Sequence, residues 1–156
     1  MAKAAKPVPE GFHTLTPYLV VQGAAEYIDF LKAAFGATEL GRSAGPGGRL
    51  MHATVKIGDS VLMLADHFSD MGAPPIAQGD WPIRLSLYVP DANATWAQAL
   101  ANGCTVVFPI QDKFWGDRYG QLKDPRGFVW AIAQHIEDLS PQEIDARAKK
   151  AFGGGQ

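Results

Sequence analysis

The sequence predicts an α+β fold made of two tandem βαβββ modules. One observation is a repeat: Leu19-Val20-Val21 and the helical pattern after it return as Leu87-Tyr88-Val89 and a second helical pattern, 68 residues later (87 − 19 = 68). The same offset persists to the end of each half, where residues 58–65 align with residues 126–133. A repeated unit of one strand, one helix and further strands implies two half-sheets side by side, with any site built between them.

The composition is ordinary for a globular chain and excludes several partners. With 156 residues, 47% of them hydrophobic and 19% charged, the chain fits one compact unit or two packed modules. A formal net charge of −2 gives no electrostatic footprint for nucleic acid or an anionic membrane, and no apolar run reaches membrane-spanning length. Residues 1–10 lack the apolar stretch of a signal peptide. The lone Cys104 excludes an internal disulfide and suits a reducing cytoplasm, which is the expected location.

The first module is expected over residues 14–67, after a flexible arm of residues 1–13 that is rich in Pro, Lys and Ala. Residues 14–21 form the first predicted strand, at an edge because Pro17 cannot donate a ladder hydrogen bond. Residues 24–35 carry apolar side chains at helical spacing, and Gly36 is placed to end the helix. Three further strands complete the module: 37–43, 49–57 and 60–65, the last two joined by a Gly-Asp hairpin turn.

A linker loop over residues 68–82 leads to the second module, which is expected over residues 83–138. Its helix begins after Asp91, a plausible N-cap, and a capping box at residues 140–143 opens a C-terminal helix within the last segment, 139–156. The predicted strands of the second module are 83–89, 105–110, 119–123 and 128–134, with a loop over 111–117.

One stretch of the second module carries a family resemblance. Phe114-Trp115-Gly116-Asp117-Arg118-Tyr119-Gly120, followed by Asp124-Pro125-Arg126-Gly127, resembles the PhnB-like, glyoxalase-like branch of the vicinal oxygen chelate superfamily. That superfamily includes glyoxalase I, bleomycin-resistance proteins and extradiol dioxygenases, and the resemblance covers residues 14–143. It implies mixed sheets that curve around a central cavity, a small-molecule ligand and a homodimer. It does not select one activity, because one architecture hosts lyases, dioxygenases and drug binders.

The resemblance also implies four positions at which metal enzymes of the superfamily carry His, Gln or Glu ligands. In this sequence those positions hold Thr16, Met63, Arg84 and Ala131. They provide no hard anionic ligand, and a guanidinium would repel a divalent cation. We therefore expect no metal and no other cofactor, with a divalent metal kept as the alternative.

Strand alternation from those positions predicts which side chains line the cavity. The opposite, helix-facing positions are uniformly apolar, which supports this phase. The expected ligand-binding set mixes aromatic, hydroxyl, imidazole and guanidinium groups with small residues: Thr16, Tyr18, His52, Thr54, Met63, Arg84, Ser86, Tyr88, Trp115, Tyr119 and Gln121.

Each of these residues also has a purely structural interpretation. Arg84 either pairs with a carboxylate on the sheet surface or anchors a ligand anion or carbonyl. His52 is either a satisfied, half-buried imidazole or, with Tyr119, a candidate for proton transfer. Trp115 is either core filler or an aromatic wall for a planar ligand.

Four polar residues outside this set are expected to be structural. His67 and His135 follow predicted strand ends and are expected to be solvated loop residues. Asp117 and Asp124 are expected to set turns and to neutralise Arg118 or Arg126.

Three functions remain open. The first is a metal-free protein that sequesters a small planar or amphipathic molecule, in the manner of bleomycin-resistance proteins. The second is a lyase, isomerase or dioxygenase that uses His52 or Tyr119, with or without a metal. The third is a homodimeric scaffold. The missing metal ligands favour the first.

Overall fold

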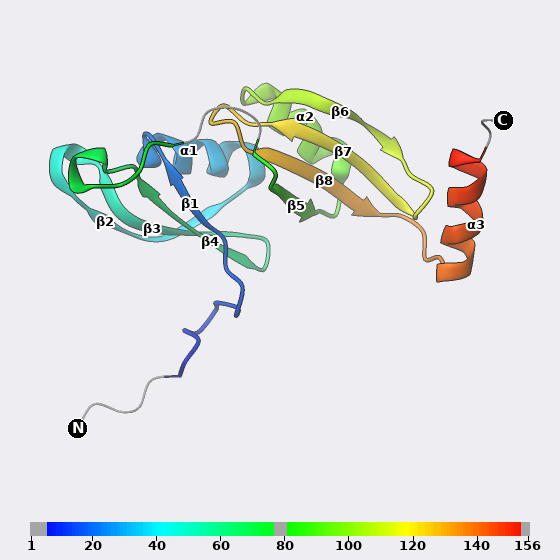
Figure 1. The fold of residues 1–156 in the computed structure, drawn as a ribbon, viewed down its shortest axis with the longest axis horizontal. Helices are drawn as coiled ribbons and strands as arrows, with labels where there is room; N and C mark the ends of the chain where they lie inside the picture. Colours follow the sequence, from blue (N-terminus) through cyan, green and yellow to red (C-terminus); the bar gives the residue numbers. More distant parts are fainter. Residues whose placement is uncertain (1–5, 77–80, 154–156) are drawn as a thin grey trace. The chain divides into compact units, whose positions relative to one another are not determined.

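The structure is a computed structural model that describes residues 6–76 and 81–153. Over this part of the chain it contains two four-stranded mixed sheets and three α-helices (Figure 1), and the chain divides into two compact units, residues 1–78 and 79–156. The α+β class and the two tandem βαβββ modules are thereby confirmed. The predicted arm, linker and C-terminal tail lie partly outside the described residues.

The first unit packs one helix on one face of its sheet. The strand order is β1-β4-β3-β2, and β1 is parallel to β4. Tyr27, Ile28 and Leu31 of the helix are buried, and Gly36 ends the helix at φ 66°. The elements are β1 (Tyr18–Val21), α1 (Ala24–Phe35), β2 (Thr38–Ala44), η1 (Pro46–Gly48), β3 (Leu50–Ile57), β4 (Ser60–Asp66) and η2 (Ser69–Met71).

The first strand is shorter than the sequence predicts, and the prediction that Thr16 lies in it is wrong. The Thr16 hydroxyl donates to the carbonyl of His13 at 2.8 Å, so this segment forms a local turn. Pro17 still takes part in the ladder by accepting from the backbone N–H of Met63 at 3.0 Å, but it has no N–H to donate. The regular strand therefore begins at Tyr18.

The second unit repeats this arrangement with strand order β5-β8-β7-β6. Asp91 caps its helix by accepting from the N–H of Ala94, and the capping box of Ser140 and Glu143 opens the C-terminal helix, as predicted. The elements are β5 (Arg84–Tyr88), α2 (Ala92–Ala101), β6 (Thr105–Asp112), β7 (Asp117–Lys123), β8 (Val129–His135) and α3 (Pro141–Phe152).

The loop predicted over residues 111–117 is reduced to a tight turn. β6 continues to Asp112 and β7 begins at Asp117, because the N–H of Lys113 donates to the carbonyl of Asp117 at 2.8 Å. The guanidinium of Arg118 pairs with Asp112 across the two strands at 2.7 Å. This places Trp115 in the turn and Asp117 on the sheet.

The structural repeat extends to how each helix begins. The Oδ1 atom of Asp66, at the end of β4, accepts from the N–H groups of Gly23 and Ala24 at 2.8 and 2.9 Å. At the equivalent position of β8, the Oε1 atom of Gln134 accepts from the N–H of Ala92 at 3.0 Å. α1 and α2 are therefore each capped by a side chain from the strand that comes last along the chain in their own sheet. Within the described residues, no helix is both long and apolar enough to cross a membrane.

Candidate functional site

The first sheet gathers four predicted ligand-binding residues on the face opposite α1. The ring of Tyr18 stacks on that of His52, with centroids 5.9 Å apart and planes at 20°. The His52 Nε2 atom lies 3.2 Å from the Thr54 hydroxyl, and Met63 pairs with Tyr18 on one side and Thr54 on the other. Leu19 next to Tyr18 is 8% exposed, whereas Tyr18 is 48% exposed, so the alternation is as predicted.

The second sheet carries four more of the predicted ligand-binding residues, two on each of the strands that flank β8. The flanking residues are Ser86 and Tyr88 on β5, and Tyr119 and Gln121 on β7. Between them β8 contributes only the methyl groups of Ala131 and Ala133. The Gln121 Nε2 atom donates to the Tyr119 hydroxyl at 2.7 Å, and the Tyr119 ring meets Trp115 edge-on, with centroids 5.5 Å apart.

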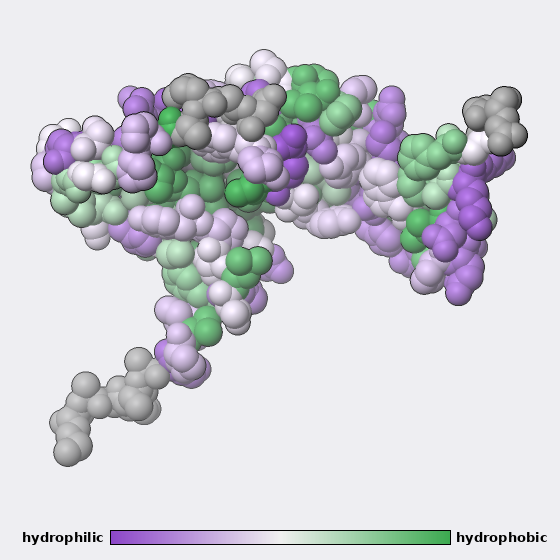
Figure 2. All heavy atoms as spheres, viewed as in Figure 1, coloured by the Kyte–Doolittle hydropathy of each residue, from purple (hydrophilic) through white to green (hydrophobic). Residues whose placement is uncertain are grey.

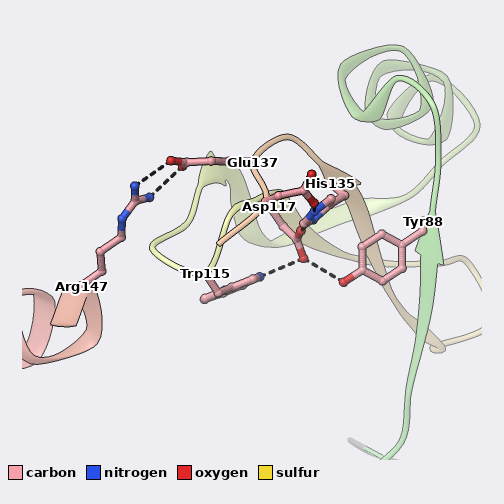
Figure 3. Close-up of polar contacts among 7 residues, drawn as sticks. Tyr88, Trp115, Asp117, His135, Glu137 and Arg147 are labelled. Atoms are coloured by element: carbon pink, nitrogen blue, oxygen red, sulfur yellow. Dashed lines mark hydrogen bonds and ion pairs between the residues drawn. The ribbon is translucent and has the colours of Figure 1, made fainter. Parts of the chain in front are cut away.

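A buried carboxylate organises this second face (Figure 3). Asp117, 3% exposed, accepts three side-chain hydrogen bonds. Its Oδ2 atom receives the Tyr88 hydroxyl at 2.8 Å and the Trp115 indole N–H at 3.0 Å, and its Oδ1 atom receives the His135 Nδ1–H at 2.8 Å. One carboxylate therefore holds side chains from β5, from the 113–116 turn and from β8.

The charges of this cluster stabilise one another. Burial raises the pKa of Asp117, but the hydrogen bonds from His135, Tyr88 and Trp115 outweigh it and hold the pKa below its ordinary value. The hydrogen bonds to Asp117 and then Asp138 raise the pKa of His135. Both ring nitrogens of His135 lie 2.8 Å from a carboxylate oxygen, which is the arrangement of an imidazolium. The bond to Asp117 likewise raises the pKa of Tyr88.

Arg84 is exposed rather than enclosed. Its Nη1 atom donates to the carbonyls of Trp81 at 2.6 Å and Ile83 at 3.2 Å. Because solvent reaches the guanidinium, its charge does not require a buried partner. If Arg84 takes part in binding, it does so by attracting an anionic ligand. It does not need a ligand to neutralise a buried charge.

A separate polar cavity of about 370 Å³ lies at the N-terminus of α1 in the first unit. Asp66 already accepts the first N–H groups of the helix, and Arg49 already forms two 2.8 Å bonds to Asp70. These groups are satisfied within the protein, so the second sheet is the stronger candidate site.

The donor set for the superfamily's metal does not fit a hard divalent cation. Of the four expected positions, Thr16 lies in a turn and donates to a backbone carbonyl, while Met63, Arg84 and Ala131 offer no anionic oxygen or imidazole. No group of three or more His, Cys, Asp or Glu among residues 6–76 and 81–153 is placed to hold a metal ion.

Sequence reasoning missed the two central residues of the cluster. Asp117 does not neutralise Arg118, which pairs with Asp112. His135 is exposed, as predicted, but it is the last residue of β8 and not a loop residue. The alternation that selected Tyr119 also places Asp117 on the open face, and the alternation through Ala133 places His135 there. Asp124 does set its turn, by accepting from the N–H groups of residues 126 and 128.

Comparison with known proteins agrees with this architecture. The family model of the Glyoxalase/Bleomycin resistance protein/Dioxygenase superfamily matches residues 11–132. The uncharacterized protein Rv0887c of Mycobacterium tuberculosis is 41% identical over 145 residues, which cover 90% of this chain and 85% of that protein.

Solved structures share the fold at lower identity. Protein PA1353 from Pseudomonas aeruginosa superimposes with a TM-score of 0.65 at 23% identity, covering 80% of this chain and 99% of that one. A PhnB protein from Bacillus cereus gives a TM-score of 0.63 at 16% identity, with coverages of 78% and 99%. The chain therefore belongs to the glyoxalase/bleomycin resistance protein/dioxygenase superfamily, and its predicted resemblance to PhnB-like, glyoxalase-like proteins is confirmed.

Proposed function

We propose that this protein binds a small planar or amphipathic molecule, without a metal, against the open face of its second sheet. The observation that carries the proposal is that Asp117 holds Tyr88 and Trp115 in place beside Tyr119. Aromatic surfaces with a few oriented polar groups are typical of small-molecule sites. Side chains that are already held in position lose less conformational entropy when a ligand binds. Homodimerisation and a cytoplasmic location stay predictions.

An enzyme of the same superfamily is the second candidate. The observation that favours it is the Asp117–His135 pair, since an imidazolium oriented by a carboxylate is a common general acid. His52 and Tyr119 remain candidates for proton transfer in a lyase, isomerase or dioxygenase. Elemental analysis of the purified protein separates the two proposals in part, because stoichiometric Zn, Ni, Mn or Fe would overturn metal-free binding.

Trp115→Leu is expected to lower the affinity for planar aromatic ligands by at least tenfold, because the substitution removes the ring that Asp117 orients. Ligands are first identified by a thermal-shift screen of planar compounds on the wild-type protein and then measured by isothermal titration calorimetry. Trp81→Leu is the matched control, outside the predicted ligand-binding set, and should retain affinity. A screen without binders, or equal losses in the two variants, would contradict the proposal.

Arg84→Met is expected to lower the affinity for acidic ligands and to leave the affinity for neutral ligands unchanged. The guanidinium is exposed, so its removal leaves the fold intact and takes away one attractive charge, an effect of about 1 kcal/mol or roughly fivefold in affinity. The measurement compares an aromatic carboxylate with the matching carboxamide by calorimetry. Equal changes for the two compounds would show that Arg84 does not read the ligand's charge.

A further inference from the structure

The C-terminal helix α3 contributes little to the core of the second unit. None of its twelve residues, all of them described, is buried, and Phe152 at its end is 76% exposed. Ile144, Ala148 and Phe152 share one side because they are four residues apart. Figure 2 shows apolar residues on one side of α3 and hydrophilic residues on the other. Its contacts therefore need a reason other than core burial.

One set of contacts connects α3 to the candidate site through aromatic rings. The ring of Phe152 meets that of Phe114 edge-on, with centroids 5.5 Å apart. Phe114 meets Trp115 edge-on at 5.1 Å, and Trp115 meets Tyr119 at 5.5 Å. A continuous run of edge-to-face contacts thus leads from the helix to the proposed ligand surface. Such pairs are favourable beyond the area that they bury.

A second set holds the segment before α3 against the turn that carries Trp115. Arg147 of α3 forms two 2.7 Å bonds to the carboxylate of Glu137 (Figure 3). The N–H groups of Ile136 and Glu137 both donate to the carbonyl of Gly116 at 3.0 Å. A Cβ atom at Gly116, where φ is +97°, would lie 2.4 Å from the Glu137 carbonyl oxygen, so only glycine permits this approach.

We propose that Phe152 is a positioning residue for the ligand surface: through Phe114 it holds the ring plane of Trp115, so that affinity depends on a helix that does not touch the ligand. The hydrogen bond to Asp117 fixes one atom of the indole but leaves rotation about that bond. The edge of Phe114 restricts this rotation, and Phe152 in turn restricts Phe114. The inference rests on the proposed function, because it concerns the same aromatic surface.

The test uses the full chain with Phe152→Ala, the ring-preserving Phe152→Tyr and, as a control on the same helix, Lys149→Ala. Trp115 is observed by ¹⁹F NMR on protein labelled with 5-fluorotryptophan, its signal being assigned with Trp115→Phe. Affinity is measured for a planar aromatic ligand of the wild-type protein. Phe152→Ala should shift or broaden the Trp115 signal and weaken binding by about 3- to 10-fold, since a side chain must then be immobilised on binding. Phe152→Tyr and Lys149→Ala should resemble the wild type. The urea midpoint of Phe152→Ala should fall only slightly, because no residue of α3 is buried.

The outcomes separate the two proposals. An unchanged Trp115 signal, or unchanged affinity in Phe152→Ala when the wild type binds, would overturn the positioning role and leave the proposed function intact. An equal loss in Lys149→Ala would also overturn it. Absence of any planar ligand for the wild type would overturn the proposed function, and the positioning role with it.

Discussion

Asp117→Ala is expected to destabilise the second unit by about 3 kcal/mol and to abolish ligand binding. The carboxylate is 3% exposed and accepts from Tyr88, Trp115 and His135, so its removal leaves three donors without their acceptor. The imidazolium also loses its buried counter-charge. Urea denaturation gives the free energy of unfolding, and calorimetry with a wild-type ligand gives the affinity.

Asp112→Ala is the matched control, because Asp112 forms an exposed ion pair with Arg118 on the same two strands. Such pairs contribute little to stability because water and salt screen them, so this variant should stay close to the wild type. Asp117→Asn should keep the shape of the side chain but lower the pKa of His135. Equal losses of stability and affinity in Asp112→Ala and Asp117→Ala would show that the effect does not depend on burial of the carboxylate.

The same cluster predicts how stability depends on pH. The pKa of His135 is raised in the folded state. The stabilisation of the fold by protonated His135 is therefore fully present below the unfolded pKa of about 6.5, and it is lost as pH rises through the folded pKa. The pKa of Asp117 is lowered in the folded state. The stabilisation of the fold by ionised Asp117 is therefore present above the unfolded pKa of about 3.9, and it is lost as pH falls through the folded pKa. The cluster is therefore most stabilising between these limits.

Asp66→Ala is expected to destabilise the first unit by about 3 kcal/mol. The Asp66 carboxylate accepts from the N–H groups of Gly23 and Ala24 at the start of α1 and, through Oδ2, from the N–H of Leu50 at 2.7 Å. Removal would leave three backbone donors in a largely buried place without an acceptor. Urea denaturation of the full chain, followed by far-UV circular dichroism, measures the loss.

The repeat supplies a matched comparison for this prediction. Gln134 stands at the equivalent position of the second unit but accepts a single N–H, that of Ala92, with a neutral amide oxygen. Gln134→Ala should therefore cost about 1 kcal/mol. If Asp66→Ala lowers the free energy of unfolding no more than Gln134→Ala does, then neither the charge of Asp66 nor its additional hydrogen bonds stabilise the first unit as we expect.

The sequence by itself determined the features that depend on neighbours along the chain. Alternation of apolar residues predicted that Leu19 faces the helix and Tyr18 the open side, and the capping chemistry of Asp91 and Ser140 predicted where two helices begin. The repeat predicted two modules. These features follow from local periodicity and side-chain-to-backbone bonds, which a sequence shows directly.

Tertiary structure alone decided which of the predicted residues act together. Asp117 meets Tyr88 and His135 because β5, β8 and β7 pair in that order, which brings together residues 29 and 18 positions apart in the chain. The same holds for Asp66, which caps a helix 42 residues earlier. The sequence neighbours of a short polar side chain do not show whether it lies in solvent or is buried against a sheet. Its partners, and hence its charge and role, are set by the strand pairing that delivers donors to it.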